Sequence, residues 1–204
     1  IVCIMSPNFV QRGDFAILPK EIRAKMAISS GADLVLELPT PYAVSSAECF
    51  SENALKILKS TNIVTAISFG VENLELELKT KVANALLDET VDRKINEWLR
   101  EGISYPAARE KALCERLGQE ISEIIKKPNN ILAIEYMKAN LKYKMGLEIL
   151  PILRKGNEHN SLDAEGEFVS ASAIRENFQQ TRRFVPDEAL GIADGFGDFA
   201  SIEN

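Results

Sequence analysis

The chain has 204 residues, of which 46% are hydrophobic and 26% are charged, and its formal net charge is -6 at pH 7. This composition is typical of a globular protein, and the negative charge argues against a general nucleic-acid coat, which requires clustered Lys and Arg. No apolar stretch approaches the roughly 20 residues that cross a bilayer, and the opening residues lack the basic flank of a signal peptide, so we expect a soluble, cytoplasmic protein.

The first part of the chain alternates predicted strands with predicted helices. An apolar run from Ile1 to Met5 leads into a loop, as buried parallel strands do, and because the chain begins inside this pattern we expect an upstream segment. The next elements are a helix from Pro19 to a stop at Gly31, a strand over 32–38, a helix over 45–59 with Ser45 or Ser46 as N-cap, and a strand over 63–69 stopped by Gly70.

The second part is richer in helix. Residues 72–118 are strongly charged and carry leucines at helical spacing, which predicts a helical layer whose charges face solvent. A helix is predicted to begin near Pro128, and a fourth strand follows over 147–153. After the polar loop 154–167, a short helix is predicted near Ser170 or Ser172, and the glycine-containing remainder is predicted to be irregular.

This alternation predicts an α/β fold with a parallel sheet of the nucleotide-binding kind. We expect residues 1–71 and 128–180 to form the nucleotide-binding core and residues 72–127 to form a helical insertion. Residues 181–204 would be an irregular tail or the start of a C-terminal region. Parallel sheets bind ligands at the carboxyl ends of their strands, which directs attention to the loops after Met5, Leu38 and Phe69.

Polar residues follow the first and third predicted strands. In the loop PNFVQRGD, Gln11 and Arg12 come directly after a strand end, where the Arg12 guanidinium suits a phosphate or carboxylate. The alternative is a surface arginine beside a turn at Gly13. Gly70, with Glu72 nearby, either lets the backbone approach a base or ribose or simply stops the strand.

Two further clusters occur beside the predicted helix at 128 and the fourth strand. Of Asn129 and Asn130, one amide suits a helix cap, which leaves the other to recognise a base or ribose. Arg154 and Lys155 follow a strand end, where cations meet phosphates in α/β nucleotide sites. The unperturbed pKa of a histidine would make His159 a candidate for proton transfer, although an isolated loop histidine is more often simply exposed.

The segment SASAIR places Ser170 and Ser172 at a predicted helix start, with Arg175 one turn later. Hydroxyls, backbone N–H groups and the positive end of a helix dipole suit a phosphate chain. Serines at this position are also ordinary N-caps, so the segment by itself leaves both interpretations open.

The three cysteines, Cys3, Cys49 and Cys114, are widely spaced and form no CxxC pair, and there is one histidine. Isolated cysteines in an odd number are typical of a reducing compartment and predict no structural metal site. Each lies in a strand-like or helix-like run, which favours inert core thiols over a reactive nucleophile.

Taken in order, the motifs of this chain resemble those of the bacterial tRNA(Met) cytidine acetate ligase family, a branch of the nucleotidyltransferase superfamily with the His-x-Gly-His signature. The resemblance covers about residues 1 to 175 and is carried by PNFVQRGD, LPTPYAVSSAECF, SFGVE, SYPAARE, KPNNILAIEYMKA, the RKG turn and SASAIR. It implies a Rossmann-like parallel sheet of the nucleotidyltransferase type with an additional helical layer.

The resemblance also implies an activity. Such a ligase uses ATP, accompanied by Mg²⁺, to convert acetate into acetyl-adenylate, and it transfers the acetyl group to the wobble cytidine of elongator tRNA(Met). Gly70, Asn129 or Asn130, and Arg154 match the family's nucleotide contacts, and SASAIR resembles the superfamily's phosphate motif. Positioned phosphates and stabilised charge are what adenylation mainly needs.

The sequence departs from the family in one large respect, because the 204 residues contain no His-x-Gly-His motif and His159 does not replace it. The chain is therefore expected to be either truncated or a degenerate homologue. Two other functions stay open: a small-molecule nucleotidyltransferase of the same superfamily, and a non-catalytic nucleotide-fold remnant with a binding role. The helical insertion and the PNNIL segment favour the ligase, whereas the missing motif favours the remnant.

Overall fold

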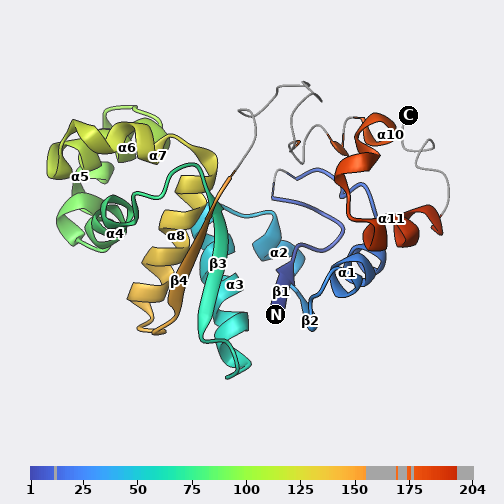
Figure 1. Ribbon diagram of the computed structural model, residues 1–204. Coiled ribbons are helices and arrows are strands. Elements are labelled where there is room, and N and C mark those ends of the chain that lie inside the picture. Colours follow the sequence, from blue (N-terminus) through green and yellow to red (C-terminus); the bar gives the residue numbers. More distant parts are fainter. Residues whose placement is uncertain (12, 155–168, 170–173, 176, 197–204) are drawn as a thin grey trace. The chain divides into compact units, whose positions relative to one another are not determined.

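The computed structural model describes residues 1–11, 13–154, 169, 174–175 and 177–196 (Figure 1). The chain divides into two compact units, one made of Ile1–Ser45 with Lys155–Asn204 and one made of Ser46–Arg154. Each unit contains one pair of parallel strands, so the parallel α/β class predicted from the sequence is confirmed.

The first unit is built on strands β1 (Val2–Met5) and β2 (Leu34–Glu37), which pair in parallel with Cys3 opposite Val35. Helix α1 (Lys20–Ser29) connects the two strands, as a βαβ unit requires. A short helix, α2 (Thr40–Ala43), follows β2 and was not predicted; Pro39 is its N-cap and Pro41 lies in its first turn.

The region after residue 177 is helical, so the prediction of irregular chain was wrong for its described part. It contains α10 (Phe178–Thr181), a 3₁₀ turn η2 (Arg182–Phe184) and α11 (Asp187–Asp194). Pro186 precedes α11, and the acidic side chains of Asp187 and Glu188 in its first turn stabilise the helix through its dipole. Helix α11 packs on α1 (Figure 1), and this packing outweighs the low helix propensity of Gly191.

The second unit contains strands β3 (Ala66–Val71) and β4 (Glu148–Leu153), also parallel, with Gly70 opposite Ile152. Helix α3 (Ala47–Ser60) packs on α8 (Pro128–Lys142), and α8 packs on β3, where the rings of Phe69 and Tyr136 stack with centroids 5.4 Å apart. Of the two serines considered as the cap of α3, Ser46 is the N-cap, since its hydroxyl accepts from the N–H of Cys49 at 3.3 Å.

Strand β3 continues through Gly70 to Val71, so the prediction that Gly70 stops this strand was wrong. A glycine in a strand leaves room for a neighbouring group to approach the backbone. Here a Cβ atom on Gly70 would lie 3.4 Å from Cγ of Arg154, so the stem of that arginine occupies the space.

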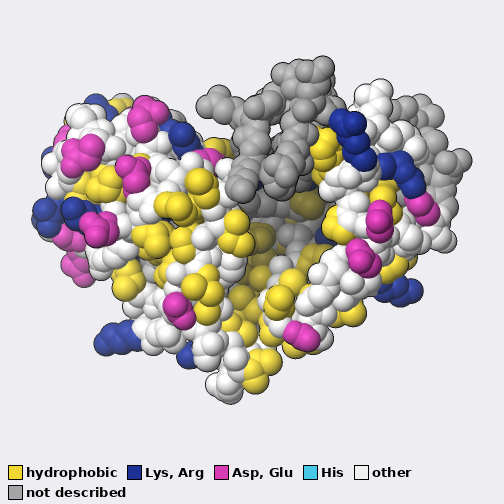
Figure 2. All heavy atoms as spheres, viewed as in Figure 1, with side chains coloured by type: hydrophobic (Ala, Val, Ile, Leu, Met, Phe, Trp, Pro, Cys, Tyr) yellow, Lys and Arg dark blue, Asp and Glu magenta, His cyan; other side chains and the backbone are white. Residues whose placement is uncertain are grey.

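The predicted helical layer is confirmed and shares a core with α8. It consists of α4 (Leu76–Ala85), α5 (Glu89–Arg100), α6 (Tyr105–Leu117), η1 (Gln119–Ile121) and α7 (Ser122–Ile125). Val82, Ile95, Leu113 and Ile124 from this layer join Ile134 of α8 in one apolar cluster. Acidic and basic side chains lie over the outside of these helices (left in Figure 2), as the charge pattern predicted.

Within the described residues, no helix is long and apolar enough to cross a membrane. All three cysteines are free thiols, with Cys114 buried and Cys3 and Cys49 half-buried. Burial raises the pKa of the Cys114 thiol, which agrees with the prediction of an inert core residue at that position.

Candidate nucleotide site

The end of the β3–β4 pair and the start of α8 meet in the second unit. Gly70 and Glu72 lie at the carboxyl end of β3, and Arg154 follows the last residue of β4. The backbone N–H of Arg154 donates to the carbonyl of Val71 at 2.9 Å, which extends the parallel ladder by one bond. The structure therefore brings together Gly70, Arg154 and the two asparagines of α8, which the sequence identified separately.

The carboxylate of Glu72 closes the first turn of α8. Its Oε1 accepts from the backbone N–H of Asn129 at 3.0 Å and from Nδ2 of Asn129 at 2.6 Å. Its Oε2 accepts from the backbone N–H of Asn130 at 2.8 Å. These backbone groups have no partner within the helix, so a carboxylate from another element satisfies them and suits the helix dipole.

Neither asparagine is the helix cap, so that part of the prediction was wrong. The N-cap position belongs to Lys127, and Pro128 occupies the first helical position, which places Asn129 and Asn130 inside the first turn. Asn130 is fully buried, and its Oδ1 accepts from the backbone N–H of Glu72 at 3.1 Å. Asn129 is only half-buried, so of the two it is the one that can reach a ligand.

The guanidinium of Arg154 is held beside Asn129. Its Nη1 donates to Oδ1 of Asn129 at 3.1 Å, while its stem lies over Gly70. Arg154 is exposed, so its planar fork can meet a ligand without displacing core residues. This cluster offers a ligand one cation and one amide, with Gly70 making room for the stem of the arginine.

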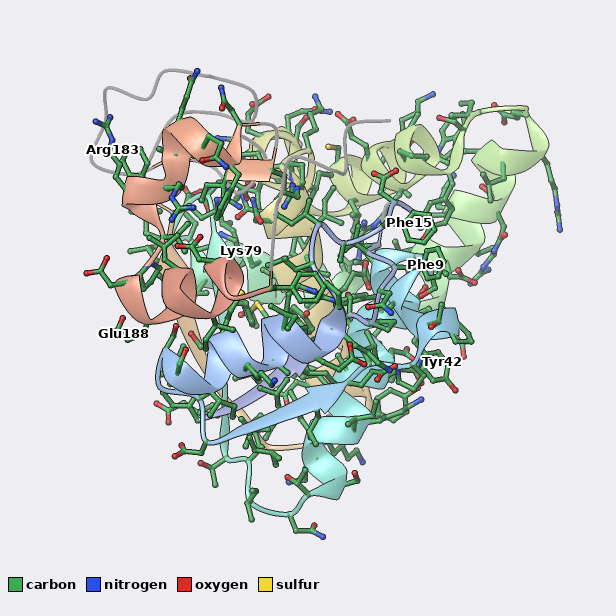
Figure 3. The ribbon with its side chains drawn as sticks, turned by 90° about the vertical axis from the view of Figure 1, so that its right-hand side faces the viewer. Phe9, Phe15, Tyr42, Lys79, Arg183 and Glu188 are labelled. Atoms are coloured by element: carbon green, nitrogen blue, oxygen red, sulfur yellow. The ribbon has the colours of Figure 1, made fainter. Side chains whose placement is uncertain are left out.

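A buried lysine binds the loop that carries Glu72. Lys79 of α4 is 0% exposed (Figure 3), and its Nζ donates to the backbone carbonyl of Asn73 at 2.8 Å and also to the side-chain Oδ1 of Asn73. Burial lowers the pKa of Lys79, and nearby Glu75 and Glu72 oppose that shift. This role was not predicted, because the charges of the helical layer were all expected to face solvent.

A second buried charge cluster joins the helical layer to α8. Nη2 of Arg109, on α6, lies 2.7 Å from Oε1 of Glu135, and Nζ of Lys138 lies 2.7 Å from both Oε2 of Glu135 and Oε1 of Glu48. Glu135 is 4% exposed and Lys138 is 6% exposed. Arg109 belongs to the SYPAARE motif, to which the sequence assigned no role.

In the first unit, the loop after β1 forms a tight turn. The N–H of Gly13 donates to the carbonyl of Val10 at 2.8 Å, and Gly13 has a φ of 84°, so the predicted turn is confirmed. Gln11 lies exposed at its tip. The ring centroids of Phe9 and Phe15 lie 4.7 Å apart. Figure 3 labels these two neighbouring side chains.

Several predicted site residues lie outside the described part of the chain, namely Arg12, Lys155, His159, Ser170 and Ser172. Arg175 is described, and it is exposed in a helical stretch with Ile174. Among the described residues, no group of three His, Cys, Asp or Glu side chains could hold a metal ion.

Comparisons with known proteins show which family this chain is similar to. The family model described as HIGH Nucleotidyl Transferase matches residues 1–197. A tRNA(Met) cytidine acetate ligase from Caldanaerobacter subterraneus subsp. tengcongensis is 43% identical over 202 residues, which covers 95% of this chain and 50% of that protein. One from Clostridium botulinum (strain Okra / Type B1) is 42% identical over 210 residues, covering 99% of this chain and 51% of that protein.

Two solved structures of Thermotoga maritima TmcAL are similar to this one. The apo form I structure has a TM-score of 0.87 at 32% identity and covers 95% of this chain and 49% of that chain. The structure bound with alpha-thio ATP has a TM-score of 0.84 at 32% identity and covers 95% and 48%. The chain thus spans about half the length of the relatives that it matches.

Proposed function

This chain belongs to the HIGH nucleotidyl transferase family and, within it, to the tRNA(Met) cytidine acetate ligases, and on that premise we propose that it forms part of an ATP-dependent acetate ligase. The substrates would be ATP, acetate and elongator tRNA(Met). The acetyl group would be attached to the exocyclic amine of the wobble cytidine. We propose a cytoplasmic location, because the tRNA substrate of such an enzyme is found there.

The reaction divides into two group transfers. An acetate oxygen attacks the α-phosphorus of ATP, the bond to the β-phosphate oxygen breaks, and pyrophosphate leaves. The cytidine amine then attacks the acetyl carbon of acetyl-adenylate, AMP leaves, and the amine loses a proton. Both steps depend mainly on positioning and charge stabilisation, which fixed cations and backbone N–H groups supply.

The observation that carries the proposal is the cluster of Gly70, Glu72, Asn129 and Arg154 where β3 and β4 end. In parallel α/β folds ligands bind at the carboxyl ends of the strands. Gly70, Glu72 and Arg154 lie at the carboxyl ends of β3 and β4, and Asn129 is hydrogen-bonded to Glu72 and Arg154. We assign Gly70, Asn129 and Arg154 to nucleotide binding. Asn130 is buried behind them, so we assign it a supporting part in the same site.

The phosphate side of the site is proposed from the sequence motifs. Ser170, Ser172 and Arg175 would contact phosphates, with Arg12, Gln11, Lys155 and His159 as further candidates. Mg²⁺ would accompany ATP, held by phosphate oxygens with few protein ligands, as is usual for this ion. We also propose the domain division of a nucleotide-binding core, 1–71 with 128–180, and a helical insertion, 72–127.

The test is an acetate-dependent pyrophosphate exchange assay with the full chain. Labelled pyrophosphate should enter ATP only when acetate is present, since acetyl-adenylate formation is reversible. Addition of elongator tRNA(Met) should then yield acetylcytidine, detected by mass spectrometry of the digested tRNA. A matched variant, Arg154→Ala, should reduce exchange, whereas Arg93→Ala on α5 should not.

Each outcome decides between the functions. Exchange with acetate, followed by tRNA acetylation, supports the ligase. ATP binding with neither exchange nor acetylation supports a non-catalytic protein of the same fold. Exchange that requires a phosphopantetheine-type acceptor instead of acetate supports a small-molecule nucleotidyltransferase. The last two results would each refute the proposed function.

A further inference from the structure

The orientation of the Asn129 side-chain amide is fixed by the chemistry of its two neighbours. An ionised carboxylate only accepts hydrogen bonds, and a guanidinium only donates them. Because Oε1 of Glu72 lies 2.6 Å from Nδ2 of Asn129, the NH₂ group of this amide must face Glu72. Its oxygen therefore faces Arg154, whose Nη1 lies 3.1 Å away. Glu72 thus determines that Asn129 presents an acceptor to Arg154.

The same carboxylate changes what the start of α8 can bind. A helix N-terminus ordinarily suits a phosphate, because its first N–H groups point outward and the dipole favours an anion. Here both oxygens of Glu72 already accept from the backbone N–H groups of Asn129 and Asn130. A phosphate would have to displace a carboxylate that accepts three hydrogen bonds from Asn129 and Asn130. The cluster therefore suits the uncharged base or ribose of a nucleotide.

Glu72 is itself held in place on both sides. Its backbone N–H donates to the buried Oδ1 of Asn130, which locks the strand end against α8. The next residue, Asn73, is bonded through its carbonyl and side chain to the buried Lys79. These contacts leave the carboxylate little freedom to swing toward solvent.

We propose that Glu72 is a positioning residue for the nucleoside half of ATP: it touches no substrate, but it orients Asn129 and through it Arg154, and it keeps phosphates away from the start of α8. Lys79 supports this arrangement by anchoring the loop that carries Glu72. The inference rests on the proposed function, since it assigns the nucleoside part of ATP to this cluster.

The substitution Glu72→Gln tests the proposal with little change of size. Glutamine offers one acceptor oxygen and one NH₂ group, so the NH₂ would meet an N–H donor of α8 where a carboxylate oxygen now lies. The control is Asp88→Asn, which makes the same chemical change at the N-cap of α5, where Asp88 accepts from the N–H of Thr90 at 2.9 Å. The second variant is Glu72→Asp, which keeps the charge but shortens the reach.

Calorimetric titrations of the full chain with adenosine, ATP and inorganic tripolyphosphate separate the two halves of the nucleotide. Glu72→Gln should weaken the binding of adenosine and of ATP by the same factor. That factor is about 10-fold to 100-fold, from the usual strength of hydrogen bonds to charged groups. Its tripolyphosphate affinity should match that of the unmodified protein. In exchange kinetics the KM for ATP should rise while kcat changes little, as expected when ground-state and transition-state binding weaken equally.

A measurement without ligand keeps the inference separate from the proposed function. In ¹⁵N NMR spectra, the Nδ2 protons of Asn129 should exchange slowly with water in the unmodified protein and in Asp88→Asn, and quickly in Glu72→Gln. Slow exchange in all three proteins would overturn the positioning role, and so would an equal loss of tripolyphosphate and adenosine affinity. If the unmodified protein binds neither ATP nor adenosine, the nucleotide assignment and the proposed function fail together, whatever the NMR result.

Discussion

Replacement of the Glu135 carboxylate is expected to destabilise the second unit strongly. Glu135 is 4% exposed and lies between two cations, with Arg109 Nη2 and Lys138 Nζ each 2.7 Å from one of its oxygens. Burial alone would lower the pKa of Lys138, but Glu135 and Glu48 raise it above its ordinary value, so Lys138 is charged at neutral pH. In Glu135→Gln, both cations lose their central anion.

The size of the effect follows from the burial of the cluster. Removing one partner of a buried ion pair typically costs about 3 to 5 kcal/mol, because it leaves an uncompensated charge in the interior. For a chain of this size, each kcal/mol lowers the melting temperature by roughly 2 to 4 °C, so we expect a decrease on the order of 10 °C. Urea unfolding followed by circular dichroism, together with thermal melts, measures both quantities.

The control is Glu97→Gln, which removes an exposed carboxylate that lies 3.1 Å from Lys94 on the same helix, α5. Exposed pairs of this kind are typically worth about 1 kcal/mol or less. The double variant Arg109→Met with Glu135→Leu should recover part of the loss, because it removes one of the two cations that lose this anion, while Lys138 keeps its contact with Glu48. If Glu135→Gln destabilises the protein no more than Glu97→Gln, the reasoning is wrong.

Three further predictions use other described residues. Arg154→Lys should weaken ATP binding about 10-fold or more in calorimetry, because an ammonium lacks the planar fork and cannot bond Asn129 in the same geometry. An unchanged affinity for ATP would exclude Arg154 from the site. Burial raises the pKa of Tyr136 to about 12, so the stability that its neutral form contributes is complete below pH 10 and is lost as the pH rises from 10 toward 12. Urea midpoints measured on both sides of pH 10 should therefore fall less in Tyr136→Phe than in the unmodified protein, and an identical fall would contradict this. Iodoacetamide should label Cys114 more slowly than Cys49, since the Cys114 thiol is buried and its pKa is raised; peptide mapping that finds Cys114 labelled first would contradict the structure.

The sequence predicted the regular elements well wherever apolar periodicity was strong. The strand over 1–5, the helix from Pro19 and the helix from Pro128 all appear within one or two residues of their predicted bounds. Helix α11 was missed because Gly191 and the glycines that follow were weighted above the Pro186 and acidic first turn that begin it. Its stability depends on packing against α1, which lies more than 150 residues earlier in the chain and is invisible to a local pattern.

The sequence identified residues that the structure places side by side, but only part of how they are bonded to one another. Gly70, Asn129, Asn130 and Arg154 were identified from their positions at strand and helix ends, and the structure brings them together. Two structural details were predicted wrongly, because Gly70 does not stop β3 and neither asparagine caps α8. The start of α8 depends on hydrogen bonds from Asn129 and Asn130 to Glu72, which lies 57 and 58 positions earlier in the chain, and no local rule could supply them.

Helix α8 connects the charged helical layer to the proposed nucleotide site. Its first turn carries Asn129 and is closed by Glu72, and about one and a half turns later Glu135 binds Arg109 of α6. A helix is stiff over so short a distance, so a displacement of α8 by the layer would move Asn129 by a similar amount.

The buried charges are costly to break and leave Arg109 Nε without a hydrogen-bond partner among the described residues. An ion pair constrains the position of α8 more than an apolar contact would. Charged hydrogen bonds require a particular distance and direction between two groups, whereas apolar side chains still pack after a small shift of one helix along the other. Arg109 of the SYPAARE motif therefore helps to set the position of α8, and with it the position of Asn129 in the first turn of that helix.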